Sequence, residues 1–188
     1  MKLLSALRTL TSSVRADYES TRRYRGKYHA EQMSASSLPA SLVTKIGLQM
    51  LCGIRTMQAL RSAGIPVAPK LVSRALRHLY GAEIHWNARI APGISLVHGN
   101  GIVISKDASV GPGCILFHNV TLGQGIDPVT RAIGAPTLES DVHIGPGATL
   151  IGPITVGAGT KIMAGAVLTQ SVPANSLVKS PAPEILAR

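Results

Sequence analysis

The chain has 188 residues, of which 45% are hydrophobic and 3% aromatic, and its formal net charge is +10 with a pI of about 10.2. This length suits one domain with an appendage, or two small domains. The polar N-terminal sequence argues against a signal peptide, and no apolar run approaches the ~20 residues of a membrane span. We therefore expect a cytoplasmic protein without a transmembrane segment, whose core is built from small and aliphatic side chains.

The positive charge is uneven, with an early cluster at Arg22, Arg23, Arg25 and Lys27. Such charge attracts nucleic acid, anionic lipid and polyanionic small molecules alike. No motif typical of nucleic-acid binding accompanies it. We interpret the charge as a solvated basic face and expect no nucleic-acid partner.

Residues 2–20 have the periodicity of an amphipathic helix. Its predicted inward stripe consists of Leu3, Leu7, Leu10 and Val14. Residues 21–40 are polar, basic and rich in serine, so we expect them to form a loop or a mobile connection.

Two further helices are predicted before the β structure begins. Ser41 is a candidate N-cap for a helix over 41–62, and a second helix over 69–80 ends at Gly81. Arg55 lies inside the first of these helices and argues against membrane insertion. We expect residues 1–81 to form a helical N-terminal region that packs on its neighbours or covers the open end of a repeat structure.

From residue 84 the sequence repeats every six residues, most regularly over 138–173, which reads LESDVH, IGPGAT, LIGPIT, VGAGTK, IMAGAV, LTQSVP. Each block opens with an aliphatic residue and has a small or β-branched residue at its fifth position. Glycine falls mostly between these two positions, where the chain must turn. A six-residue period is typical of a parallel β-helix. We therefore predict a mainly β fold in which residues 82–188 form a hexapeptide-repeat domain.

The cysteine content gives no sign of a metal site, because Cys52 and Cys114 are the only two cysteines. Cys114 falls at a fifth position of a repeat, so we expect a buried, reduced thiol. No metal ion is expected.

Two irregularities interrupt the repeat. We call the aliphatic residue that begins each block its opener. Two extra residues separate the openers Leu96 and Ile104, and ten extra residues separate the openers Leu122 and Leu138. Loops on rigid scaffolds are where function often resides. Both insertions are therefore candidate parts of a functional site.

Three blocks make one triangular coil, so openers three blocks apart stack on one face. The predicted face consists of Leu96, Leu116, Ile144 and Ile162. The third positions of the same blocks also stack, as His98, His118, Pro146 and Ala164. Two imidazoles in adjacent coils, about 5 Å apart, followed by residues without long side chains, predict a groove with reactive groups at one end.

Three segments carry a resemblance to a known family: GAEIHWNARIAPGISLVHGNGIVIS, then VTLG, then IGPGATLIGPITVGAGTKIMAGAVLTQSVPANS. They resemble the serine acetyltransferase family of hexapeptide acyltransferases. The resemblance implies a left-handed parallel β-helix and a homotrimer with acetyl-CoA bound between neighbouring subunits. In the family a longer helical N-terminal domain joins two trimers, so a hexamer is the alternative assembly.

The resemblance also assigns roles to residues. It implies that His98 is the catalytic base and that Glu83 is its acidic partner, in keeping with the need for a base in acyl transfer to a hydroxyl. Pro146 and Ala164 correspond to the channel for acetyl-CoA. Gly123, at the end of VTLG, would also lie at the co-substrate.

Lys161 either reaches a phosphate of acetyl-CoA or is a solvated lysine. His118 is a candidate for binding the acceptor hydroxyl, against the alternative of a buried, hydrogen-bonded histidine.

The chain departs from the family pattern where the family binds serine. Val97 stands where the family has an aspartate, and Gly134 and Ala135 stand where it has an arginine and a histidine. Arg131, in the lengthened loop, is the candidate replacement for the lost cation. We therefore expect L-serine to be a poor acceptor.

The function predicted from these features is an acetyl-CoA-dependent O-acetyltransferase with a histidine base. Its acceptor is L-serine or a related small hydroxylated molecule. The alternatives are an O-acetyltransferase that acts on a sugar or glycan intermediate, and a non-catalytic β-helix scaffold that binds partners through its basic helices.

Overall fold

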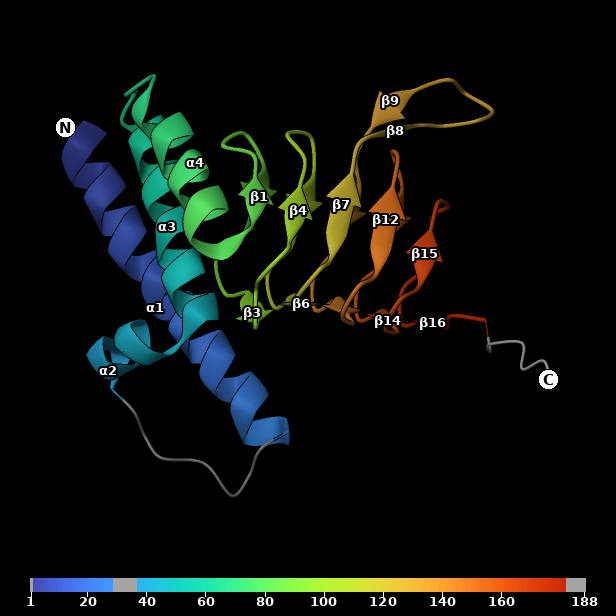
Figure 1. Ribbon diagram of the computed structural model, residues 1–188, viewed down its shortest axis with the longest axis horizontal. Helices are drawn as coiled ribbons and strands as arrows, with labels where there is room; N and C mark the ends of the chain where they lie inside the picture. The colour runs from blue at the N-terminus through green and yellow to red at the C-terminus, as the bar shows by residue number, and fades with distance from the viewer. Residues whose placement is uncertain (1, 29–36, 182–188) are drawn as a thin grey trace.

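The computed structural model describes residues 2–28 and 37–181, in which helices cover one end of a parallel β-solenoid (Figure 1). The helices are α1 (Lys2–Tyr28), α2 (Leu38–Thr44), α3 (Ile46–Ser62) and α4 (Ala68–Tyr80). α1 contacts α3 and β3, and α4 contacts α3 and β1. The predicted β-helix with a short helical N-terminal region is confirmed.

The solenoid is built from three parallel sheets, which we call sheets A, B and C. Sheet A contains β1 (Glu83–Ile84), β4 (Val103–Ile104), β7 (Thr121–Gly123), β12 (Thr149–Ile151) and β15 (Val167–Leu168). Sheet B contains β2 (Arg89–Ile90), β5 (Ser109–Val110), β10 (Thr137–Leu138) and β13 (Thr155–Val156). Sheet C contains β3 (Ser95–Val97), β6 (Ile115–Phe117), β11 (His143–Ile144), β14 (Lys161–Ile162) and β16 (Leu177–Val178).

The register of sheet C confirms the predicted stacking of the repeats. Leu96 pairs with Leu116, Leu116 with Ile144, and Ile144 with Ile162. These openers are all buried, because every coil turns its aliphatic residue toward the solenoid axis. Cys114 is buried and free, as expected from its fifth position.

Glycine lets successive coils come close together at their corners. A Cβ atom on Gly145 would lie 2.7 Å from the backbone nitrogen of Ala164 in the next coil. Gly147 meets no such obstacle but has a φ of +70°, which other residues rarely adopt. The recurring glycines of the sequence therefore serve both close contact between coils and tight turns.

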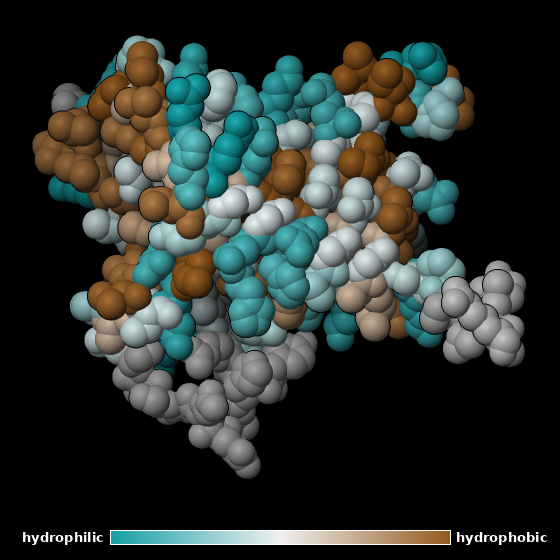
Figure 2. Space-filling model, in the orientation of Figure 1, coloured by the Kyte–Doolittle hydropathy of each residue, from teal (hydrophilic) through white to brown (hydrophobic). Residues whose placement is uncertain are grey.

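The ten extra residues form a hairpin that projects from the solenoid (Figure 1). Its strands, β8 (Gly125–Ile126) and β9 (Ile133–Gly134), pair antiparallel. Ile126, Val129 and Ile133 on this hairpin are exposed. Figure 2 shows hydrophobic surface there and again over the first part of α1.

The prediction for the first helix was wrong in its length and in its buried face. α1 continues through residues 21–28, which the sequence suggested were part of a loop, whereas residues 29–36 lie outside the described part. Leu3 and Leu7 are 58% and 48% exposed, and the buried residues on α1 include Asp17 instead. The reason is a charged partner for Asp17 on another helix.

That partner is Arg55 of α3. Its guanidinium donates to both carboxylate oxygens of Asp17, at 2.7 and 3.0 Å, and both side chains are almost fully buried. Arg55 also donates to the carbonyl oxygens of Ile90 and Ala91, while Asp17 accepts from the backbone nitrogen of Gly93. The pair thus satisfies backbone groups at the open end of the first coil, which confirms that the helices cap the solenoid.

The second predicted helix is split in two. Lys45 has extended backbone angles between α2 and α3, and Ser41, the candidate N-cap, is a buried residue inside α2. The helix that ends at Gly81 is confirmed, since Gly81 adopts the left-handed conformation typical of a C-cap. One continuous hydrophobic core joins α3 and α4 to the solenoid.

Within residues 2–28 and 37–181, no helix is both long and apolar enough to cross a membrane.

Candidate functional site

The two extra residues after Leu96 form a bulge, residues 98–102, at the corner between sheets C and A. The backbone N–H of Asn100 donates to the backbone carbonyl of His98 at 2.7 Å, and the backbone N–H of Asn119 donates to that of Asn100 at 2.8 Å. His98 has a φ of +65°, a conformation uncommon for residues other than glycine. The next residue, Gly99, packs against α3, where a Cβ atom would lie 2.4 Å from the sulfur of Met50.

The two histidines predicted to stack do so. The rings of His98 and His118 lie edge to face with centroids 5.8 Å apart. The column continues through Pro146 and Ala164, because the Gly147 nitrogen donates to the His118 carbonyl and the Gly165 nitrogen to the Pro146 carbonyl. The structure therefore brings these four residues together at one corner of the solenoid; we call them the histidine column.

The imidazoles of the column differ in their surroundings. His98 is exposed, whereas His118 is half-buried and its Nδ1 has no hydrogen-bond partner among the described residues. An unpaired buried nitrogen is costly unless a ligand or water binds it. His118 thus carries an unsatisfied buried nitrogen directly beside the exposed ring of His98.

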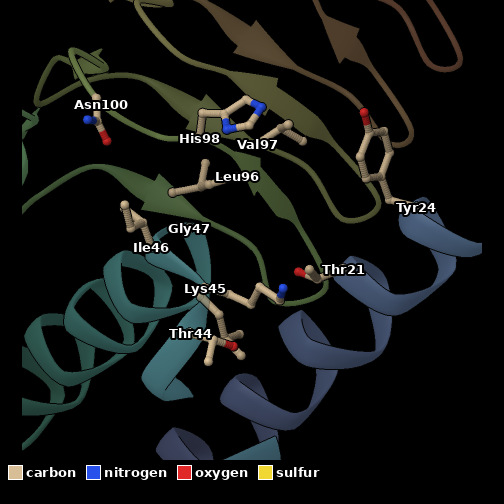
Figure 3. A pocket seen from close by; sticks show the side chains of 11 residues that line it. Thr21, Tyr24, Thr44, Lys45, Ile46, Gly47, Leu96, Val97, His98 and Asn100 are labelled. Atoms are coloured by element: carbon tan, nitrogen blue, oxygen red, sulfur yellow. The ribbon is translucent and has the colours of Figure 1, made fainter. Parts of the chain in front are cut away.

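A cavity of about 420 Å³ opens beside His98, between the bulge and the helices (Figure 3). Its walls come from α1, the junction of α2 and α3, β3 and the bulge. The lining residues are Thr21, Tyr24, Thr44, Lys45, Ile46, Gly47, Leu48, Leu96, Val97, His98 and Asn100. No local sequence pattern pointed to Thr21, Tyr24 or Lys45, because only the docking of the helices brings them to the bulge.

Glu83, the predicted partner of His98, lies on β1 one coil away. Its backbone nitrogen donates to the carbonyl of Ile102 at the end of the bulge. Its carboxylate forms an ion pair with Arg77 of α4, and both side chains are 57% exposed. The structure therefore places Glu83 next to the bulge with its carboxylate engaged by another residue.

The remaining predicted residues are more scattered. Lys161 is exposed on β14 of sheet C. Gly123 ends β7, where a Cβ atom would lie 2.5 Å from the side chain of Ile151. Arg131 lies in the β8–β9 hairpin, at the corner between sheets A and B, and so not at the corner of His98.

His85 lies at the corner between sheets A and B and has a structural role. Its Nδ1 accepts a hydrogen bond from the backbone N–H of Asn87 at 3.0 Å, and its ring stacks on Trp86. Burial, followed by the nearby charge of Lys106, lowers the pKa of His85. The described residues contain no group of three or more His, Cys, Asp or Glu side chains that could hold a metal ion.

Residues 135–170 match a protein-family model, the bacterial transferase hexapeptide of six repeats. Serine acetyltransferase from Synechococcus elongatus is 39% identical over 133 residues, which are 70% of this chain and 53% of that protein. Serine acetyltransferase from Bacillus subtilis is 36% identical over 138 residues, which are 73% of this chain and 62% of that protein. The chain thus aligns with little more than half the length of these two relatives.

The same family is found among solved structures. Serine acetyltransferase isoform 3 from Entamoeba histolytica, determined in complex with cysteine, superimposes with a TM-score of 0.81 at 28% identity. The superposition covers 99% of this chain and 64% of that one, so it includes the helices as well as the solenoid. With the repeat match and the two relatives, it shows that the chain belongs to the serine acetyltransferase family of hexapeptide-repeat transferases.

Proposed function

We propose that the chain is an acetyl-CoA-dependent O-acetyltransferase that acetylates a small hydroxylated acceptor. The main support is the exposed imidazole of His98, which is fixed at the edge of a cavity and begins a column of short side chains. The relatives named above are serine acetyltransferases, which supports the reaction class.

In this reaction the neutral imidazole of His98 takes the proton of the acceptor hydroxyl as its oxygen attacks the thioester carbonyl. The C–O bond forms, the C–S bond breaks, and the imidazolium returns the proton to the departing thiolate. Base catalysis of this kind contributes typically ~10²–10⁴-fold. His118, whose ring centroid lies 5.8 Å from that of His98, would contact the acceptor through the half-buried edge of its imidazole.

Glu83 acts in this proposal as a positioning residue. Its carboxylate would turn from Arg77 toward His98, fix the tautomer of the imidazole and stabilise the imidazolium. Pro146 and Ala164 leave a smooth path along the column for the arm of acetyl-CoA, with Lys161 on sheet C to meet its phosphates. Gly123 lies at the other edge of sheet A and would reach the co-substrate from a neighbouring copy of the chain.

We also propose a homotrimer, with a hexamer as the larger alternative. Arg131 and His98 lie at different corners of one solenoid, so Arg131 can act at the site only if a second copy supplies it. Multi-angle light scattering at micromolar concentration tests this, and a monomer would contradict a site shared between subunits.

The catalytic proposal is tested by release of free thiol from acetyl-CoA with a panel of acceptors. We expect His98→Asn to lose at least ~10²-fold in turnover and to stay folded, because asparagine tolerates positive φ. His78→Asn on the exposed face of α4 is the matched control, and Glu83→Gln should lose less than His98→Asn. Activity of His98→Asn within tenfold of wild type would remove His98 from the mechanism. Wild-type protein inactive toward every acceptor would favour the scaffold alternative.

A further inference from the structure

The cavity beside His98 contains a lysine that the proposed reaction does not use. Lys45, at the junction of α2 and α3, is half-buried and its side chain extends toward Thr21 of α1 (Figure 3). The ion pairs found among the described residues do not involve Lys45. An ammonium group that is partly withdrawn from water and has no counter-ion favours the binding of an anion.

Other donors line the same cavity. The Thr21 hydroxyl oxygen is buried without a hydrogen-bond partner among the described residues. α3 begins at Ile46, so the backbone N–H groups of Ile46 and Gly47 have no partner within the helix. The positive end of the helix dipole is therefore also directed to this region.

Glycine at position 47 makes this arrangement possible. A Cβ atom there would lie 2.0 Å from the carbonyl oxygen of Leu96, on the strand that leads into His98. The close approach of helix and strand places Lys45 and the start of α3 in one cavity with the proposed base. A cation and a general base thus line the same space.

None of the described residues that line this cavity is acidic. A cationic group on the acceptor would therefore meet Lys45 with no carboxylate to balance it. We propose that the acceptor is a hydroxy acid without a cationic group, whose carboxylate binds Lys45 while its hydroxyl faces His98. This inference rests on the proposed function, since His98 must be the base for the hydroxyl to have a role.

A carboxylate suits the cavity better than a phosphate does. It carries one negative charge, which one lysine balances, whereas a phosphate monoester carries about 1.5–2 negative charges at pH 7. Thr21 and the free N–H groups of α3 can then accommodate the second carboxylate oxygen. A sugar acid and a small hydroxy acid share this chemistry.

Four small ligands that differ in one group each test the inference: glycerate, L-serine, glycerol and glycerol 3-phosphate. Their dissociation constants are measured by calorimetry or ligand-observed NMR with the full chain, and their turnover by thiol release. In wild type, glycerate should bind about tenfold to a hundredfold more tightly than glycerol, the range of one charge-assisted contact. L-Serine should bind more weakly than glycerate.

Lys45→Met should bring the affinity ratio of glycerate to glycerol close to one, and Lys45→Arg should restore most of it. Lys106→Met is the matched control, because Lys106 is exposed and pairs with Asp107 at another corner. If Lys45→Met does not fold, the affinities of the four ligands for wild-type protein still test the inference. Equal binding of glycerate and glycerol, or tighter binding of L-serine or glycerol 3-phosphate than of glycerate, would overturn the inference. Binding in the expected order without turnover would instead contradict the proposed reaction.

Discussion

In the solenoid most buried positions are filled by apolar side chains, with Ser95 and Thr160 as buried polar residues, whereas the buried face of α1 carries Asp17 and three other small or polar residues. The solenoid buries apolar area, which stabilises it in proportion to that area. α3 and α4 share the solenoid's hydrophobic core, whereas α1 is attached through the paired charges of Asp17 and Arg55 and their hydrogen bonds to the first coil. The chain therefore uses two kinds of buried contact: apolar packing inside the solenoid, and paired charges where α1 meets the exposed backbone of the first coil.

The reason lies in the end of the solenoid. A parallel coil at the end of the stack has backbone N–H and C=O groups that no further coil can bind, and buried groups of this kind need partners. Aliphatic side chains could not supply them. Asp17 and Arg55 do so for Ile90, Ala91 and Gly93, which explains why α1 turns a polar face inward.

The largest effect should come from breaking this pair. Arg55→Met leaves the Asp17 carboxylate buried without its partner, and removal of one partner of a buried ion pair costs about 3–5 kcal/mol. Urea unfolding followed by circular dichroism measures the loss. Arg15→Met is the control, because Arg15 and Glu19 form an exposed pair worth at most about 1 kcal/mol. Equal loss in both variants would show that the cap is not held by this pair.

The regular part of the fold could be predicted because its information is local. Outside the two insertions, each aliphatic residue that opens a block lies six residues from the next. Counting these residues in threes gives the sheet register that the structure shows, such as Leu116 paired with Ile144. The histidine column followed from the same count, since His98 and His118 occupy equivalent positions in adjacent coils.

The cap and the cavity could not be predicted in this way. The stripe of Leu3 and Leu7 obeys helical periodicity, yet it is exposed because Asp17 needs Arg55, a residue thirty-eight positions away. Lys45 reaches the cavity only because the helix breaks there and α3 docks at Gly47. No local pattern specifies such distant contacts.

A core substitution in the solenoid tests whether apolar burial stabilises its coils. Leu116 is fully buried between Leu96 and Ile144, so Leu116→Ala should cost about 2–5 kcal/mol through lost burial and a residual cavity. The control is Val129→Ala at the exposed β8–β9 hairpin, where a change within about 0.5 kcal/mol is expected. Chemical denaturation of both variants gives the two values. A small loss at Leu116 would mean that the coils, like the cap, rely on polar contacts.

The smallest effect on stability is expected at the contact between α1 and β3, where the helical region meets the solenoid. Ser20 of α1 and Ser95 of β3 lie with their hydroxyl oxygens 3.0 Å apart in a buried contact. Ser20→Ala leaves the hydroxyl of Ser95 without this partner, which should cost about 1–3 kcal/mol. The double variant Ser20→Ala with Ser95→Ala removes both polar groups and should be more stable than either single variant, because no buried hydroxyl is left unpaired. Ser12→Ala, at an exposed position of the same helix, is the control. Losses that simply add in the double variant would show that the two hydroxyls do not interact, and that this contact depends on Asp17 and Arg55 instead.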